Sequence, residues 1–247
     1  MIKVLKKIFT LMIVCAGANA QNKDLVQYVN TLQGTNSNWG LSYGNTYPTI
    51  AVPFPVHSWS PQTGKNGDGW KYTWTAKTIR GFQQVHQCSP WMGDYAVFSL
   101  MPVTGKLQVS EAQRAAAFSR SNETAKPHYY KVKFDNGITT EIAPTERAGH
   151  LRFSFTPGQS AFLVLDGYTK TSGVTIHPKE RKITGYVRNG TFIPKDFRCY
   201  FEMQFDQPFI STERGKTGKM GSGKEIYQIQ VMAKAPTLNS KKELLCK

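Results

Sequence analysis

The stretch YYKVKFDNGITTEI, residues 129–142, decides the fold class. Apolar and polar residues alternate through YYKVKF before the turn sequence DNG, and the alternation resumes in ITTEI after it. An alternating run has one face to bury and one to expose, and a DNG-type turn joins two such runs. The stretch therefore predicts an antiparallel β-hairpin formed by residues 129–134 and 138–142.

Working outward from this hairpin, further short β-type runs follow, closed by turn signals such as TPG and NG. Strands repeating at roughly 8–12-residue spacing with such turns are typical of an all-β sandwich. We therefore predict one antiparallel β-sandwich domain over residues 21–233, followed by a polar tail over residues 234–247. The additional predicted strands are residues 151–155, 161–165, 183–188, 197–205 and 226–232.

Little helix is expected. A short helix is predicted over residues 23–32, because Leu25, Val26, Val29 and Leu32 share one face at helical spacing.

Composition supports one substantial core, since 40% of the 247 residues are hydrophobic. The net charge of +15 raises the question of nucleic-acid binding. The basic residues are scattered, however, or gathered at residues 215–224 and 241–247, without the dense stripe and interleaved aromatics of a nucleic-acid site. The sequence GKTGKMGSGK lacks P-loop spacing and predicts a hairpin loop. We expect no nucleic-acid partner.

The N-terminus resembles a secretory signal peptide over residues 1–20. Lys3, Lys6 and Lys7 precede a short apolar stretch, and Ala18-Asn-Ala20 has the small-x-small form of a cleavage site. The apolar stretch is too short to span a bilayer, so no membrane span is expected. Lipidation at Cys15 is the alternative, which the bulky residue before it disfavours. We expect an exported protein, periplasmic or secreted, whose mature chain starts at Gln21.

Three cysteines remain in the mature chain: Cys88, Cys199 and Cys246. They form no CxxC motif and no Cys/His pair at metal-ligand spacing, so no zinc site is expected. One disulfide plus a free thiol and three free thiols both remain open.

Residues 34–104 hold all five tryptophans together with His57, His86 and many glycines and prolines. Aromatic faces that stack on a sugar ring, beside short polar groups that bind its hydroxyls, are what a carbohydrate site needs. The alternative for any single tryptophan is packing in the core or a turn.

The same region carries a family resemblance. Its motifs are similar, in order and approximate spacing, to the opening of glycoside hydrolase family 92, which contains exo-acting α-mannosidases. The resemblance covers about residues 28–105. The matching motifs are GNTYP at 44–48, VPF at 52–54, WSPQT at 59–63, GWKY at 69–72, IRGF at 79–82, HQCSPW at 86–91, GDY at 93–95 and LMPVT at 100–104.

The resemblance implies an N-terminal β-sandwich that packs on a larger C-terminal (α/α)₆ barrel. Family members invert configuration with a Glu acid and an Asp base, use calcium, and keep the carboxylates and most calcium ligands in the barrel. This chain stops before that barrel. It is therefore expected to hold no catalytic residue and no metal site, to be inactive alone, and to have mannose-containing glycans and the barrel as partners.

Three residues are proposed to bind substrate: His86, Trp91 and Asp94. Trp91 would stack on a sugar ring and His86 would contact a hydroxyl, with core or turn packing as the alternative for each. Asp94 would either touch sugar or fix the loop by accepting backbone N–H bonds, the latter being favoured. The other histidines are isolated in the sequence and receive no role: His57, His128, His150 and His177.

Two other function classes remain open. One is a stand-alone exported carbohydrate-binding module, and the other is an exported structural or surface-interaction β-sandwich. An open reading frame downstream that encodes a barrel would favour the mannosidase over both.

Overall fold

The computed structural model describes residues 24–36, 46–66, 71–87, 94–167, 172–190, 193–208, 211–216, 227–232 and 242–246. Its regular structure is one 3₁₀ helix, η1 (Leu25–Tyr28), followed by fifteen strands, β1 to β15. Every pair of neighbouring strands within a sheet runs antiparallel. The predicted all-β antiparallel class is confirmed.

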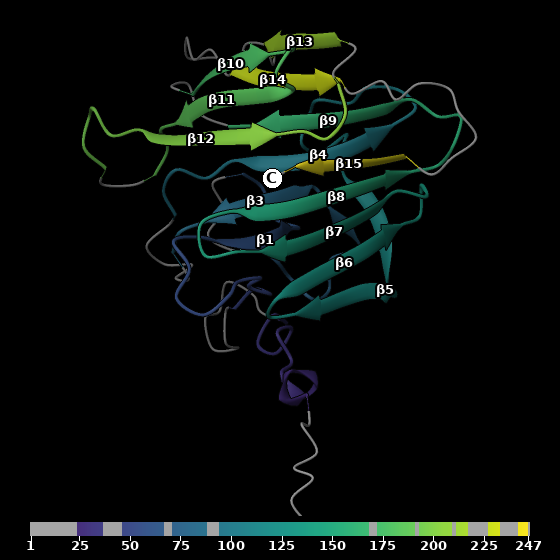
Figure 1. Cartoon of the computed structure of the whole chain (residues 1–247). Helices are drawn as coiled ribbons and strands as arrows, with labels where there is room; N and C mark the ends of the chain where they lie inside the picture. Colours follow the sequence, from purple (N-terminus) through teal and green to yellow (C-terminus); the bar gives the residue numbers. More distant parts are fainter. Residues whose placement is uncertain are drawn as a thin grey trace, which may run out of the picture.

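Two six-stranded sheets form the body of the domain (Figure 1). The first has the order β1-β3-β4-β9-β14-β13 and the second β15-β8-β7-β6-β5-β2, while β10-β11-β12 form a smaller third sheet. The first sheet comprises β1 (Ser58–Gln62), β3 (Gly81–Val85), β4 (Ser99–Thr104), β9 (Ala161–Asp166), β14 (Tyr227–Met232) and β13 (Ser211–Lys216). The second comprises β15 (Lys242–Cys246), β8 (Gly149–Phe155), β7 (Thr139–Pro144), β6 (Tyr129–Phe134), β5 (Ala116–Lys126) and β2 (Thr78–Ile79). The third comprises β10 (Gly173–His177), β11 (Lys182–Val187) and β12 (Cys199–Gln204).

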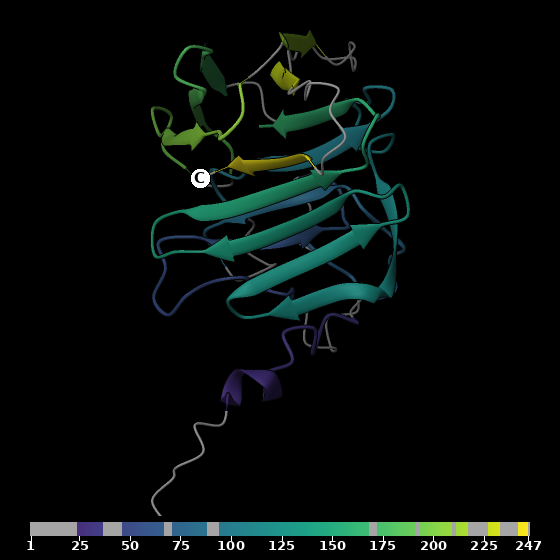
Figure 2. The ribbon, with the colours of Figure 1, turned by 45° about the vertical axis from the view of Figure 1, so that its right-hand side comes forward.

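The second sheet lies in front of the first in Figure 1, and the turned view of Figure 2 separates the two layers. Side chains from both layers meet between them. Phe82 of β3 contacts Tyr130 and Phe134 of β6 at ring-centroid distances of 6.1 and 6.3 Å. All three rings are completely or almost completely buried, as are Leu100 and Phe153. The hydrophobic core therefore fills the space between the layers, as in a β-sandwich.

The hairpin expected from residues 129–142 is strands β6 and β7, paired with Tyr130 opposite Ile142. Burial alternates along β6, as the sequence pattern requires. Gly137 occupies the turn with φ +88°, a conformation that glycine adopts at little cost. The predicted runs at 151–155, 161–165, 183–188, 197–205 and 226–232 correspond to strands β8, β9, β11, β12 and β14.

The structure differs from the sequence prediction at both ends of the domain. In the described part of the range 23–32, the expected helix is present only as the single turn η1. Leu25 is 68% exposed and Val29 49% exposed, so no packing partner stabilises a longer helix. Within the expected polar tail, β15 pairs with β8, so this stretch contains an edge strand.

Candidate functional site

The connection between β3 and β4 carries the proposed substrate-binding residues. The structure describes both of its ends, His86 with Gln87 and the stretch from Asp94 onward. Trp91 and Cys88 lie outside the described residues, so the proposed role of Trp91 stays a prediction.

Asp94 ties the two ends of this connection together. Its carboxylate accepts backbone N–H bonds from His86 and Gln87, each at 3.2 Å, and from Tyr95 at 2.8 Å. The Lys71 ammonium lies 3.8 Å from Oδ2, and both side chains are buried. Burial raises the pKa of Asp94, an effect that Lys71 and the backbone donors oppose. Asp94 thus has the loop-fixing geometry that the sequence favoured, and its contact with sugar stays a prediction.

Tyr95 holds the His86 ring through two contacts. Its Nδ1 lies 2.9 Å from the Tyr95 carbonyl oxygen, to which it donates, and its ring stacks on Tyr95 at a centroid distance of 5.0 Å. This bond selects the tautomer whose Nε2 carries a lone pair, because the carbonyl can only accept. Burial lowers the pKa of His86. A neutral acceptor nitrogen of this kind can bind a hydroxyl group.

His57, isolated in the sequence, is a neighbour of His86 in space. The two ring centroids are 6.3 Å apart, and His57 also contacts Trp59 edge-on at 6.3 Å. Burial lowers the pKa of His57, and the nearby His86 lowers it further. Sequence separation hid this pair, because β1 and β3 bring the two residues together by pairing Ser58 with Val85.

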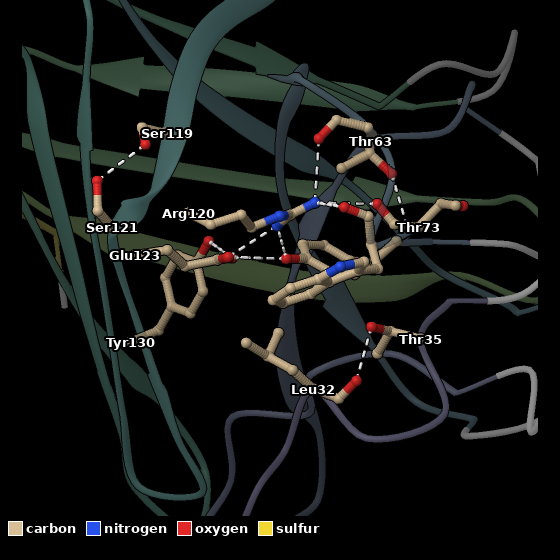
Figure 3. A network of polar contacts seen from close by, with 12 residues as sticks. Leu32, Thr35, Thr63, Thr73, Ser119, Arg120, Ser121, Glu123 and Tyr130 are labelled. Atoms are coloured by element: carbon tan, nitrogen blue, oxygen red, sulfur yellow. Dashed lines mark hydrogen bonds and ion pairs between the residues drawn. The ribbon is translucent and has the colours of Figure 1, made fainter.

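A cluster around Arg120 holds the segment that directly follows Lys71 (Figure 3). The register of β5 against β6 shifts between Phe118 and Glu123, within the stretch that carries Arg120. The Arg120 guanidinium lies over the rings of Tyr72, Trp74 and Phe118 at 4.6–5.0 Å from their centroids. It also donates to the Trp74 and Ala76 carbonyl oxygens. Residues 72–76 are thereby clamped to the edge of the second sheet.

Glu123 completes this cluster. Its carboxylate pairs with Arg120 at 2.7 Å and accepts hydroxyl bonds from Tyr72 at 2.8 Å and Tyr130 at 2.6 Å. Burial raises the pKa of both tyrosines, with a further contribution from the Glu123 charge. The hydroxyls therefore remain protonated donors, and the cluster acts as a structural clamp.

A second buried network, missed from the sequence, lies against the other face of the first sheet. Arg114 Nη1 lies 2.7 Å from Asp166 Oδ2, and both side chains are essentially inaccessible. Asn66 donates to Asp166 through Nδ2 at 2.9 Å and to Glu111 through its backbone N–H at 2.6 Å. The segments joined here are separated by 45–100 residues, which no local pattern reveals.

These carboxylates are engaged as structural acceptors. Inverting hydrolysis needs an acid and a base roughly 6.5–9.5 Å apart with room for water between them. Asp166 is 1% exposed and bound to Arg114 and Asn66, while Glu111 accepts from Gln62 and Asn66. Among the described residues, no group of three or more His, Cys, Asp and Glu side chains could hold a metal ion.

Cys199 is free and half-buried, and burial raises its pKa. Cys88 and the side chain of Cys246 lie outside the description, so the pairing of these two stays open. No helix in the described residues is long and apolar enough to cross a membrane.

Comparison with known proteins identifies the domain. The family model of the glycosyl hydrolase family 92 N-terminal domain matches residues 28–242. An inverting mannosidase of family GH92 from Bacteroides thetaiotaomicron superposes with a TM-score of 0.84 at 36% identity, over 92% of this chain and 32% of that chain. A GH92 α-mannosidase from the same organism, at 21% identity over 91% of this chain and 32% of that chain, has the same fold, with a TM-score of 0.72.

A curated relative from Arthroderma benhamiae, an uncharacterized secreted glycosidase, is 26% identical over 159 residues, which are 60% of this chain and 20% of the relative. The chain thus spans about a third of the solved relatives and a fifth of the curated one. The model match extends past residue 233, so the family domain includes the start of β15. The chain belongs to glycoside hydrolase family 92, as its N-terminal domain.

Proposed function

We propose that this chain is the substrate-side domain of an exported, calcium-dependent, inverting exo-α-mannosidase that acts on mannose-containing glycans. Its role is to present the loop of residues 86–95 to the sugar. The acid, the base and the calcium ligands come from a second domain, the (α/α)₆ barrel, and the chain alone does not hydrolyse mannosides.

One observation carries this proposal. Within this family 92 N-terminal domain, the buried Asp94 carboxylate accepts the backbone N–H bonds that fix a motif-bearing loop. The His86 ring beside it keeps one nitrogen as an acceptor. A carboxylate that fixes the loop in this way holds the neighbouring contact residue in a productive position. We assign the sugar contacts to His86 and Trp91, and assign Asp94 to their positioning.

A nearby surface is a suitable docking face for the barrel. Phe54 is 99% exposed, and its backbone has φ +57°, a strained value for a residue with a side chain. Val56, two residues on, is 65% exposed, while its backbone N–H is fixed to the Glu146 carbonyl oxygen at 2.9 Å. Phe54 and Val56 thus expose apolar side chains on a strained, anchored backbone beside His57. We expect them to contact another protein surface.

The test is a chimera in which residues 28–242 replace the N-terminal domain of the Bacteroides inverting mannosidase. In that chimera, His86→Ala and Trp91→Ala should lower kcat/KM for an α-mannoside at least tenfold, with little change in melting temperature. His150→Ala, on β8 of the second sheet, is the matched control and should leave kcat/KM unchanged. Equal activity of the His86→Ala, Trp91→Ala and His150→Ala chimeras would refute the proposed substrate contacts.

A further inference from the structure

The third sheet, β10-β11-β12, lies at the end of the domain drawn at the top of Figure 1, and the loop-based function gives it no role. Alternate residues of its three strands pack against the hydrophobic core, among them Val174, Ile183 and Phe201. Successive side chains of a strand point to opposite faces of the sheet. The residues between these core contacts therefore form a second face, the outer face, which is directed away from the core.

Strand register arranges the outer face in two neighbouring rows. Directly opposed residues form one row of Gly173, Tyr186 and Tyr200 and a second row of Thr175, Thr184 and Glu202. An open hollow of about 710 Å³ is lined by all six residues. Its volume lies within the range of small-molecule sites, and side chains in adjacent rows of a sheet are close enough to touch one ligand.

The first row exposes aromatic surface. Tyr200 is 71% exposed, and its ring lies 6.0 Å from that of Tyr186 between centroids. Gly173 leaves room for the Tyr186 ring, because a Cβ atom there would lie 2.6 Å from Tyr186 Cε1. The Arg198 guanidinium lies over the same ring at 4.7 Å. Tyr186 is thus held from both sides, and Tyr200 beside it presents its ring to solvent.

The second row supplies polar groups next to these rings. Glu202 is exposed, and its carboxylate lies 3.7 Å from the Lys182 ammonium. The Thr184 hydroxyl lies 2.9 Å from His177 Nε2. A carboxylate has two acceptor oxygens, and a threonine hydroxyl can both donate and accept. Hydrogen-bonding groups therefore border the exposed ring along one side.

We propose that the outer face binds pyranose rings of a mannose-containing glycan, with the choice of mannose resting on the proposed function. A pyranose has C–H groups on its ring face and hydroxyls at its edge. Its face can pack on Tyr200, while its hydroxyls bond to Glu202 and Thr184. A lipid or protein surface would require a wider apolar patch than one bordered by a polar row. Glu202 disfavours a polyanion, because like charges repel at short range.

The direct experiment is calorimetry of the full chain with an α-linked mannopentaose. Tyr200→Ala should weaken binding at least fivefold, because the stacking surface is lost. Glu202→Gln should weaken it about threefold, since the acceptor loses its charge. Tyr28→Ala is the matched control, because Tyr28 lies on η1 and is also 71% exposed, and it should bind as the native chain does. Absence of saturable binding, or unchanged affinity in Tyr200→Ala, would overturn the proposal.

A ¹H–¹⁵N spectrum separates this site from the proposed substrate loop. Mannopentaose should shift the amide resonances of Thr184 and Glu202. Shifts confined to His86 and Tyr95 would place all binding in the loop, which would overturn this inference and leave the proposed function standing. The His86→Ala chimera tests the loop contacts independently.

The same chimera distinguishes a glycan from the barrel as the occupant of the outer face. Tyr200→Ala should lower kcat/KM for a mannan polymer at least threefold more than kcat/KM for a nitrophenyl α-mannoside, because only the polymer extends beyond one sugar. Equal losses for the two substrates would indicate that Tyr200 contacts the barrel, and would overturn the proposal.

Discussion

Strand β6 alternates buried and exposed residues, whereas all five residues of β1 are buried and three of them, Ser58, Ser60 and Gln62, are polar. The second sheet follows the usual rule of one apolar and one wet face. In the first sheet, strands β1, β3, β4 and β9 are buried on both faces, one in the core and the other under segments held by Arg114, Asp166 and Asn66. The family motifs WSPQT and LMPVT lie on β1 and β4 of this sheet. A surface that must hold loops in fixed positions therefore depends on buried polar contacts more than on alternation.

The largest expected effect comes from breaking the Arg114–Asp166 pair. Arg114→Ala leaves a carboxylate buried without its cation, which typically costs ~3–5 kcal/mol of unfolding free energy. Arg152→Ala, which removes the exposed Arg152–Glu141 pair of the second sheet, should change it by less than about 1 kcal/mol. Urea unfolding of both variants checks this contrast. Similar losses in the two variants would remove the distinction between the sheets.

Asp94→Ala should have the next largest effect, about 2–3 kcal/mol, because three backbone donors and Lys71 lose a buried acceptor. Amide hydrogen exchange should quicken at His86, Gln87 and Tyr95 before it does in β6. The control Asp135→Ala, in the exposed turn between β6 and β7, should stay within about 0.5 kcal/mol. Unchanged exchange at those three amides would show that the loop is held by something else.

The sequence predicted the second sheet better than the first for a physical reason. The β6–β7 hairpin is specified by adjacent residues, with DNG supplying its turn. By contrast, β4 pairs with β9 and β9 with β14, so partners such as Leu100 and Leu165 are far apart in the chain.

The same reason limits what could be predicted of the site. The motif HQCSPW and the nearby Asp94 were found because they lie close together in the sequence. The contacts from Lys71, His57 and Arg120 depend on strand pairing and on the register shift in β5, which no local pattern encodes.

Gly137→Ala tests the turn of the β6–β7 hairpin, and we expect a smaller loss of unfolding free energy than in the variants above. The backbone there has φ +88°, and an added Cβ would lie 2.5 Å from Thr156 Oγ1, so we expect a loss of roughly 1–2 kcal/mol. Gly158→Ala has a similar φ of +82° with open space around the position, and should cost less. Thermal unfolding compares the two, and equal losses would mean that backbone strain alone accounts for both.

Acid pH should lower the unfolding free energy of the domain through its buried histidines. We expect this to be the smallest of the predicted effects. The pKa values of His57 and His86 are lowered in the folded state, so below the reference value of 6.5 the unfolded chain binds protons that the folded chain does not. Their stabilising contribution is therefore present above that pH and is lost as the pH falls. Unfolding free energy from about pH 7.5 to about pH 5.5 should decline less steeply in His57→Gln than in His150→Gln. Parallel pH profiles would contradict this assignment.

The central claim is that this domain supplies substrate contacts and no hydrolytic chemistry. The most direct measurement is mannose release from an α-mannoside by the purified chain, with and without calcium, beside the chimera that carries residues 28–242. The account predicts no release by the chain alone and calcium-dependent release by the chimera, since an acid and a base are each typically worth ~10²–10⁴-fold in rate. Turnover by the chain alone that co-elutes with it would contradict the account.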